Sequence, residues 1–284
     1  IISDFKETLS QVREKGETQV FQAVLNLRDM RSIAVNIKLT PLKNSEAEVQ
    51  GVAVVVDDLT ERMERDQQMR IMQTYLPPGM VENIHTISSL ALGGERRLVT
   101  CMFVEVRSLP ALAGVRPREK MAILNTFLSV ATEQIHAVGG VIDKYMGNEI
   151  MVLFNSQLNP MDDHARRAVD AALHLRDAFE ALYASAGITA DLNDYRAGIH
   201  TGIATLGNVG SLNRRDFTAI GDTINLAKRL EENAGRSQII LSEDSLHAIQ
   251  AQGGTMLYKF VELAPMQVKG REQKTQVYEV FRSR

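Results

Sequence analysis

Two polar residues near the middle of the chain are the first candidates for chemistry. Lys144 and Asn148 lie in the segment 141–154, whose alternating first half and apolar second half predict a β-hairpin. Gly147 supplies the backbone freedom that a tight turn requires. The sequence therefore predicts an ammonium group on one arm and an amide at the turn, close together. On its own, a lysine on a strand is more commonly a solvated charge, so its neighbours decide the interpretation.

A second pair lies in the segment 214–231, where a helix is predicted over 223–233. Asn225 and Arg229 are four residues apart, and this spacing places them on one face of a helix. A guanidinium group matches the geometry of a phosphate. Taken alone, the pair also fits an ordinary amphipathic helix with solvated charges.

The elements that must position these residues follow one another from residue 98 onward. We expect strand 98–107, helix 118–138, hairpin 141–154, helix 161–184, strands 195–201, 203–209 and 215–219, helix 223–233, strand 238–241, helix 243–250 and terminal strands. Strand, helix, hairpin, helix, strand is the split βαβ order of an α+β, ferredoxin-like fold. In that fold the helices cover one face of a mainly antiparallel sheet, so we expect the other face to be open to a ligand or partner.

Composition limits the partners and the cellular setting. The chain has 284 residues, 44% of them apolar, which favours two folding units with real cores. A net charge of −3 offers no basic surface for nucleic acid, and no window reaches the roughly 20 apolar residues of a membrane span. The single cysteine, Cys101, lies in an apolar run and is expected to be a buried thiol, which suits the cytoplasm. Because the chain begins at Ile1 without a signal sequence, we expect further sequence upstream, and a membrane or sensor region there stays possible.

Residues 1–57 form the first predicted unit. A helix over 4–15 precedes three strand-like runs at 19–27, 32–40 and 49–56. This helix and antiparallel meander resemble the C-terminal half of a PAS sensor domain. We find no residue in it that would hold haem or flavin.

Residues 58–94 form a predicted helical linker. The segment 59–76 is charged and contains neither Gly nor Pro, and its apolar residues follow an interrupted heptad. It is either a solvated amphipathic linker or a parallel two-stranded coiled coil that transmits a signal. Pro77-Pro78-Gly79 ends it, a short helix over 81–85 follows, and a loop over 93–97 is the expected domain boundary.

Residues 95–284 resemble the class III nucleotidyl cyclases. The hairpin resembles their pattern of Lys, two variable residues, Gly and Asp, with Asn148 in place of the Asp. The run Phe-Val-Glu-Val-Arg at 103–107 resembles their Phe-Ala-Asp-Ile-Arg, with Glu105 in place of the Asp. The segment 214–231 closely resembles their most recognisable signature. In that family the two Asp residues hold Mg or Mn, so the resemblance implies an altered metal pair, and Glu105 and Asn148 could equally be surface polar residues at strand ends.

The resemblance also assigns roles to residues that this chain retains. Lys144 and Thr218 align with the family's purine-selecting pair and fit adenine, so ATP is the expected nucleotide. Asn225 would orient the ribose, Arg229 would meet the charge that builds on the α-phosphate, and Arg214 would bind phosphate. Glu149 follows Asn148 directly, but adjacent strand residues point to opposite faces, so we do not expect it to replace the missing carboxylate.

Two hypotheses follow from this pattern. Family sites form between two protomers, one supplying the metal carboxylates and the other the groups that hold the nucleotide. The chain is either an adenylate cyclase that converts ATP to cyclic AMP and pyrophosphate, weakly or not at all as a homodimer, or a pseudo-cyclase. A pseudo-cyclase would act as a dimerisation module or as the complement of an intact cyclase partner.

Overall fold

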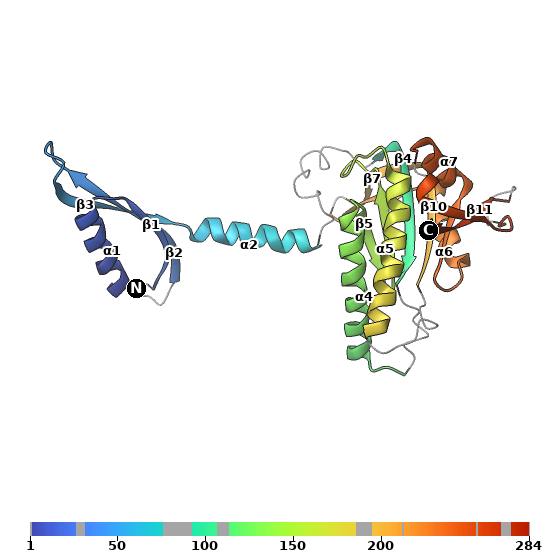
Figure 1. The fold of residues 1–284 in the computed structure, drawn as a ribbon, viewed down its shortest axis with the longest axis horizontal. Coiled ribbons are helices and arrows are strands. Elements are labelled where there is room, and N and C mark those ends of the chain that lie inside the picture. Colours follow the sequence, from blue (N-terminus) through green and yellow to red (C-terminus); the bar gives the residue numbers. More distant parts are fainter. Residues whose placement is uncertain are drawn as a thin grey trace. The chain divides into compact units, whose positions relative to one another are not determined.

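The computed structural model describes residues 2–26, 32–75, 93–106, 114–185, 195–211, 213–253, 255–267 and 274–283. The chain forms two compact units, Ile1–Tyr75 and Leu76–Arg284 (Figure 1). The predicted helix at 81–85, the break at 77–79 and residue Arg107 lie outside the described residues. Within these ranges no helix has the length and apolar character needed to cross a membrane.

The first unit is a helix packed on a small antiparallel sheet. Helix α1 (Ile2–Lys15) covers strands β1 (Gln19–Asn26), β2 (Ser32–Lys43) and β3 (Val49–Asp58), which pair in the order β1-β2-β3. Alternate residues of β2 face the helix because successive strand residues point to opposite sides. The buried centre consists of Val12, Val35, Ile37 and Leu39. The predicted helix and meander are confirmed, and the likeness to half of a PAS domain stays a prediction.

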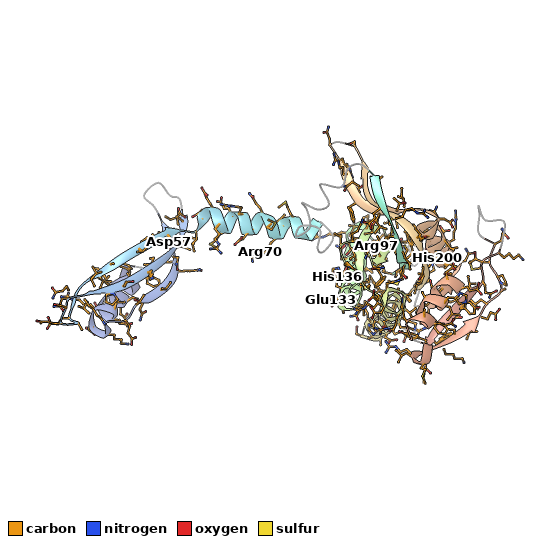
Figure 2. The ribbon with its side chains drawn as sticks, turned by 90° about the horizontal axis from the view of Figure 1, so that it is seen from above. Asp57, Arg70, Arg97, Glu133, His136 and His200 are labelled. Carbon is orange, nitrogen blue, oxygen red and sulfur yellow. The ribbon has the colours of Figure 1, made fainter. Side chains whose placement is uncertain are left out.

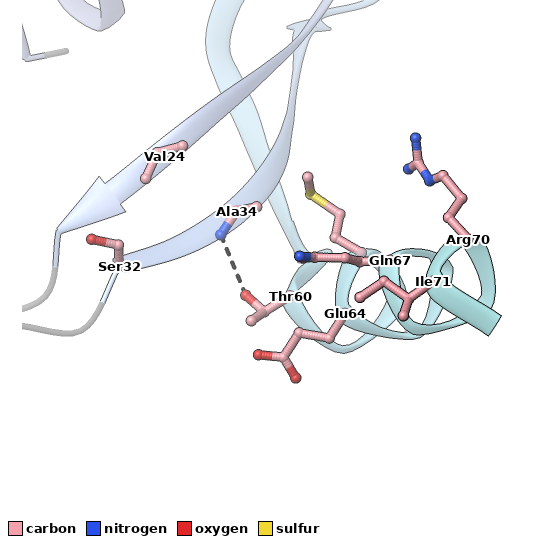
Figure 3. A pocket seen from close by; sticks show the side chains of 9 residues that line it. Val24, Ser32, Ala34, Thr60, Glu64, Gln67, Arg70 and Ile71 are labelled. Carbon is pink, nitrogen blue, oxygen red and sulfur yellow. Dashed lines mark hydrogen bonds between the residues drawn. The ribbon is translucent and has the colours of Figure 1, made fainter. Parts of the chain in front are cut away.

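Helix α2 (Thr60–Tyr75) leaves this sheet directly after β3. Its first residue anchors it, because the Thr60 hydroxyl accepts a hydrogen bond of 3.3 Å from the backbone N–H of Ala34 (Figure 3). Together with β1 and β2 it borders an open groove of about 670 Å³, whose lining includes Val24, Met63 and Ile71. Met63, Met69 and Met72 are exposed along α2. The coiled coil stays a prediction.

The second unit is built on one mixed sheet. Its strands are β4 (Gly93–Glu105), β5 (Val141–Met146), β6 (Glu149–Phe154), β7 (Arg196–Gly210), β8 (Arg215–Ile220), β9 (Gln238–Ser242), β10 (Tyr258–Glu262) and β11 (Val277–Arg282). They pair in the order β10-β11-β9-β7-β4-β6-β5, with β8 added to β7. The part β7-β4-β6-β5 is antiparallel and has the predicted ferredoxin-like order. The expected α+β fold is therefore confirmed.

Helices lie on both faces of this sheet. Helices α4 (Pro117–Ala137), α5 (His164–Ser185) and α7 (Glu243–Ala251) bury their apolar sides in the main core on one face (Figure 1). Helix α6 (Asp222–Asn233) covers a second apolar cluster on the other face. The expectation of a face left open is therefore wrong in part.

A glycine allows α6 to lie directly on the sheet. A Cβ atom at Gly198 of β7 would stand 2.1 Å from the backbone nitrogen of Glu231 in α6 and 2.5 Å from the carbonyl oxygen of Ala227. No other residue type permits so close an approach of helix and strand. The position of every α6 side chain over the sheet therefore depends on Gly198.

Three expected boundaries also change. Residues 93–97 are part of β4 rather than a loop, because they pair with β7 from Gly93 opposite Asn208 to Arg97 opposite Ala204. The two strands predicted on either side of Gly202 are one strand, β7, since Gly202 itself pairs with Val99 of β4. Helix α5 begins at His164 rather than at residue 161.

Candidate functional site

The predicted site residues of the hairpin and of β4 lie on the face of the sheet that α6 covers. Phe103 of β4 and Met151 of β6 belong to the apolar cluster beneath α6. Glu105 follows Phe103 by two residues and therefore points to the same side. Lys144 is the cross-strand partner of Met151 and shares that side too. Two groups of polar residues form on this face, and we call them the metal corner and the base corner.

The metal corner contains Glu105, Asn148, Glu149, Arg196, Lys228 and Glu231. The Asn148 side-chain amide donates a hydrogen bond of 2.7 Å to Glu105 Oε1. The other carboxylate oxygen of Glu105, Oε2, lies 2.5 Å from Arg196 Nε in an ion pair. The hairpin turn is fixed to the end of β4, because the backbone N–H of Val106 donates to the carbonyl of Asn148 at 2.9 Å. Both oxygens of Glu105 are therefore engaged within the chain.

Glu231 of α6 links the cations of this corner, and its side chain has no solvent exposure. Its Oε1 lies 2.7 Å from Arg196 Nε, although the Arg196 N–H is not aligned for a hydrogen bond. Its Oε2 accepts from Lys228 Nζ at 2.6 Å. Burial raises the pKa of Glu231, and the positive charges of Lys228 and Arg196 oppose that rise. A buried carboxylate therefore depends on two basic residues that sequence reasoning did not select.

Glu149 completes the network and corrects an expectation. Its Oε1 lies 2.8 Å from Lys228 Nζ, so its side chain points to the α6 face rather than away from it. Asn148 belongs to the turn and not to β6, which begins at Glu149. The rule that neighbouring strand residues point to opposite faces therefore does not separate these two side chains.

These residues do not fit a pair of divalent metal ions. Mg²⁺ and Mn²⁺ favour several oxygen ligands, mainly carboxylates. Here the one carboxylate at the two predicted ligand positions is held by an amide and a guanidinium group, and a second cation, Lys228, lies in the same network. Among the described residues, no group of three or more His, Cys, Asp or Glu side chains is arranged to hold a metal ion.

The base corner contains Asp143, Lys144 and Thr218. The Thr218 hydroxyl, on β8, donates a hydrogen bond of 2.8 Å to Asp143 Oδ2. Lys144 Nζ lies 3.3 Å from the same oxygen. Burial raises the pKa of Asp143, and the hydrogen bond from Thr218 and the charge of Lys144 act against that rise. The structure therefore brings the predicted pair Lys144 and Thr218 together through a carboxylate that sequence reasoning did not select.

A bulge in β5 changes the predicted alternation of the hairpin. Ile142 pairs with Val152 and Lys144 pairs with Met151, so Asp143 is an extra residue between them. The side chain of Tyr145 consequently points to the other face, where its hydroxyl lies 2.7 Å from Thr132 Oγ1 on α4. Strict alternation would place Lys144 on the same face as Ile142. Because of the bulge, the two side chains lie on opposite faces.

The remaining predicted residues are exposed. Asn225 and Arg229 are both solvent-accessible positions of α6, as a shared helix face requires, and Arg229 Nη1 donates to Glu232 at 2.8 Å. Arg214 lies in the turn between β7 and β8, where its carbonyl accepts from the backbone N–H of Ser211 at 2.8 Å. Among the contacts of the described residues, neither corner holds any of the three.

The fold also buries three side chains that lie outside the two corners, and among them the burial of Cys101 was predicted. Cys101 is fully buried, and burial raises the pKa of its thiol well above the usual value. His200 lies in the second unit, where Figure 2 labels it. Its Nδ1 is 2.7 Å from the Ser242 hydroxyl, and Nδ1 of His164 is 2.7 Å from the Thr100 hydroxyl. These buried hydrogen bonds fit a role in packing rather than in proton transfer.

Comparison with known proteins identifies relatives of this chain. Adenylate cyclase 1 of Rhizobium meliloti is 33% identical over 215 residues, which is 72% of this chain and 31% of that protein. The chain thus spans about a third of the length of this relative. Residues 94–281 match the adenylate and guanylate cyclase catalytic domain.

Solved cyclases of both base specificities share the fold. The adenylyl cyclase CyaB of P. aeruginosa aligns with a TM-score of 0.61 and 29% identity, over 68% of this chain and 98% of that one. A guanylyl cyclase aligns with a TM-score of 0.57 and 27% identity, over 66% of this chain and 94% of that one. By the match over residues 94–281, this chain belongs to the family of adenylate and guanylate cyclase catalytic domains.

Proposed function

We propose that the chain is an ATP-binding signalling protein of this family that makes cyclic AMP weakly or not at all as a homodimer. The observation that carries the proposal is the engagement of Glu105 by both Asn148 and Arg196. A carboxylate whose two oxygens already bind an amide and a cation must give up those partners to bind a metal ion. Divalent metal supplies charge stabilisation at the phosphates in phosphoryl chemistry.

The preference for ATP over GTP rests on the base corner. The Lys144 ammonium is a donor that suits N1 of adenine, and the Thr218 oxygen is an acceptor that suits the 6-amino group. Guanine presents an N–H and a carbonyl at those two positions, so the same pair would meet it donor to donor and acceptor to acceptor. Because the family includes enzymes of both specificities, base preference is part of the proposal.

The exposed residues of α6 and of the β7–β8 turn complete the proposed nucleotide site. Asn225 would hydrogen bond to the ribose, and Arg229 would pair with a phosphate in exchange for Glu232. Arg214 would add a further cation. The Arg229–Glu232 pair is partly exposed, with 45% and 39% of the two side chains accessible, so this exchange requires little energy.

We also propose that the chain forms homodimers. Cyclase domains of this family act as dimers, and α2 carries exposed methionines that a partner helix would cover. Sedimentation over a range of protein concentrations tests this. A dimer at micromolar concentration is expected, and a mass that stays monomeric at every concentration would contradict it.

Production of cyclic AMP is the test of the main proposal. The purified chain is incubated with ATP and either Mg²⁺ or Mn²⁺, and cyclic AMP is measured beside a sample without metal. We expect little or no product, because losing a metal carboxylate plausibly removes about two to four decades in rate. Robust magnesium-dependent turnover would refute the proposal.

A second candidate function is the complementing half of a heterodimeric cyclase. It is favoured by the retained set Lys144, Thr218, Asn225 and Arg229 beside an altered metal pair. Such a chain would supply nucleotide-binding groups to a partner that supplies the metal carboxylates.

Mixing two forms of this chain tests that candidate. One form is the unmodified chain, and the other carries Glu105→Asp and Asn148→Asp together with Arg229→Ala. If the chain complements, the mixture makes cyclic AMP while each form alone is inactive. An inactive mixture in which heterodimers are detected by mass would exclude it.

A further inference from the structure

We propose that Asp143 sets the base preference of the site by fixing the direction in which Thr218 shares its hydroxyl proton. Asp143 would not touch the nucleotide; it would act as a positioning residue behind Thr218 and Lys144. The inference rests on the proposed function, because it requires these two residues to face a purine. It assigns a role to the extra residue of β5 that family resemblance did not single out.

The bulge in β5 brings the carboxylate to the site. The cross-strand pairs run from Ile142–Val152 directly to Lys144–Met151, and Asp143 is the residue without a partner on β6. A bulge turns the side chains that follow it to the other face. Ile142 belongs to the core beneath α4 and α5, whereas Met151 belongs to the cluster beneath α6. Lys144 therefore reaches the α6 face because Asp143 is inserted before it.

The contact between Asp143 and Thr218 joins distant strands. Thr218 lies on β8, which pairs with β7, and β7 is separated from β5 by β4 and β6. The hydrogen bond of 2.8 Å between the two side chains therefore requires β8 to cross over the face of the sheet toward β5. Only 3% of the Asp143 side chain is exposed, so the carboxylate lies behind the two residues it binds.

The chemistry of a hydroxyl group explains the effect on the base. Thr218 has one proton to donate and two lone pairs that accept. An ionised carboxylate only accepts, so the proton of Thr218 must point to Asp143. The oxygen then faces the site as an acceptor, which suits an amino group at position 6 of a purine and disfavours a carbonyl there.

The same carboxylate also orients the second base-contacting group. Lys144 Nζ lies 3.3 Å from Asp143 Oδ2, while 41% of the Lys144 side chain is exposed. The ammonium is therefore held from behind and keeps further N–H donors directed to solvent, where a ligand would bind. One buried carboxylate thus presents a donor and an acceptor side by side.

The test is the ratio of the dissociation constants for GTP and ATP, measured by calorimetry without divalent metal. For Asp143→Asn, an amide can donate as well as accept, so Thr218 is released to donate to a carbonyl. We expect the preference for ATP to fall by about tenfold, which is the range for one mismatched hydrogen bond. Asp162→Asn is the matched control, because Asp162 is an exposed carboxylate just before α5, outside both corners, and its loss should leave the ratio unchanged.

Two variants of Thr218 separate positioning from a general structural effect. Thr218→Ser keeps the hydroxyl and should keep the preference for ATP. Thr218→Val removes it, and the double variant with Asp143→Asn should then show no further loss in the ratio. Lys144 remains a donor in both variants, so the ratio changes only through the hydroxyl of Thr218. Additive losses would show that Asp143 acts by another route and would overturn the inference.

The outcomes distinguish this inference from the proposed function. If the unmodified chain prefers ATP and folded Asp143→Asn keeps the same ratio, the inference fails while the proposed function stands. If the unmodified chain binds neither nucleotide, both fail. A melting curve confirms folding of each variant. Asp143→Asn is expected to fold because Asn has nearly the size of Asp and the cation left behind, Lys144, has 41% of its side chain exposed to water.

Discussion

The two corners of the α6 face use their charges in opposite ways. In the metal corner, the Arg196 and Lys228 cations are each paired with two carboxylates of the same chain. In the base corner, one buried carboxylate holds two donors, and the ammonium of one of them is partly exposed. The charges of the metal corner are therefore paired within the chain, whereas in the base corner the Lys144 ammonium stays accessible to solvent.

Under the proposed function, this difference would let one fold keep nucleotide binding and lose metal binding. Glu105 is one methylene longer than the Asp that the family resemblance predicts, and its Oε2 reaches Arg196 at 2.5 Å. Asn148 adds a donor where a carboxylate would have been a ligand. Internal cations therefore neutralise the carboxylates of the metal corner, while the base corner changes in neither residue of the predicted pair.

Restoring the two carboxylates of the metal corner should have the largest effect on activity. Glu105→Asp with Asn148→Asp withdraws one carboxylate from Arg196 and replaces an amide donor by an acceptor. Cyclic AMP production with Mn²⁺ is expected to rise at least about tenfold, which needs only roughly 1.4 kcal/mol of transition-state stabilisation. The same exchanges at two exposed positions of α4, Glu133→Asp with Asn125→Asp, are the control.

A double variant that folds and binds ATP but stays inactive would contradict this prediction. The defect would then lie outside the metal corner, most plainly in a dimer that does not close around the nucleotide. Sedimentation of the same variant would separate a missing dimer from an unproductive one.

Lys144→Glu should shift the base preference of the base corner from adenine toward guanine. A carboxylate accepts from the N1 hydrogen of guanine, so the preference is expected to move toward GTP by about tenfold. Competition calorimetry measures it, and Lys259→Glu on exposed β10 controls for the change of charge. An unchanged preference would remove Lys144 from base recognition.

Glu231→Gln should weaken the fold without changing base preference. It removes a fully buried carboxylate that pairs with both cations of the metal corner. Removing one member of a buried ion pair costs about 3–5 kcal/mol, and the partial exposure of Arg196 and Lys228 reduces this to roughly 2 kcal/mol. Urea unfolding measures the loss.

The control for this variant is Glu232→Gln, next to it on α6. Its partner Arg229 is 45% exposed, so a loss below about 1 kcal/mol is expected. Equal losses for the two variants would show that the network around Glu231 adds no stability.

The smallest effect concerns pH and the face beneath α5. Burial lowers the pKa of His164, which is hydrogen bonded to Thr100. Between that lowered value and the unfolded value of about 6.5, the unfolded chain binds a proton that the folded chain does not, so stability falls as the pH drops through this window. In urea unfolding, His164→Asn should flatten the dependence of stability on pH, whereas His247→Asn, at an exposed position, should leave it unchanged. If His164→Asn keeps the full pH dependence, His164 is not its source.

Much of this arrangement could be predicted from the sequence. The hairpin, the helices and the ferredoxin-like order follow from periodicity and turn residues, since local patterns report local structure. The placement of Lys144 with Thr218, and of Glu105 with Asn148, followed from the family resemblance. These predictions concern residues whose type alone suggests a role.

The partners of those residues could not be predicted, for physical reasons. Arg196, Lys228 and Glu231 come together only because Gly198 lets α6 lie directly on β7. Asp143 is recognisable only once the register of β5 and β6 is known, because a bulge leaves no clear mark in a short alternating segment. Long-range packing and strand register therefore set the details of both corners.

The dependence of ATP binding on metal tests the central claim most directly. Calorimetry of the unmodified chain with ATP is carried out once with a chelator and once with saturating Mn²⁺, and repeated for Glu105→Asp with Asn148→Asp. A self-neutralised metal corner predicts affinities within about threefold of each other for the unmodified chain, which is less than roughly 1 kcal/mol, and a clear gain with Mn²⁺ for the double variant. A gain of about a hundredfold with Mn²⁺ in the unmodified chain would show that its metal corner accepts a divalent ion, and would contradict the account.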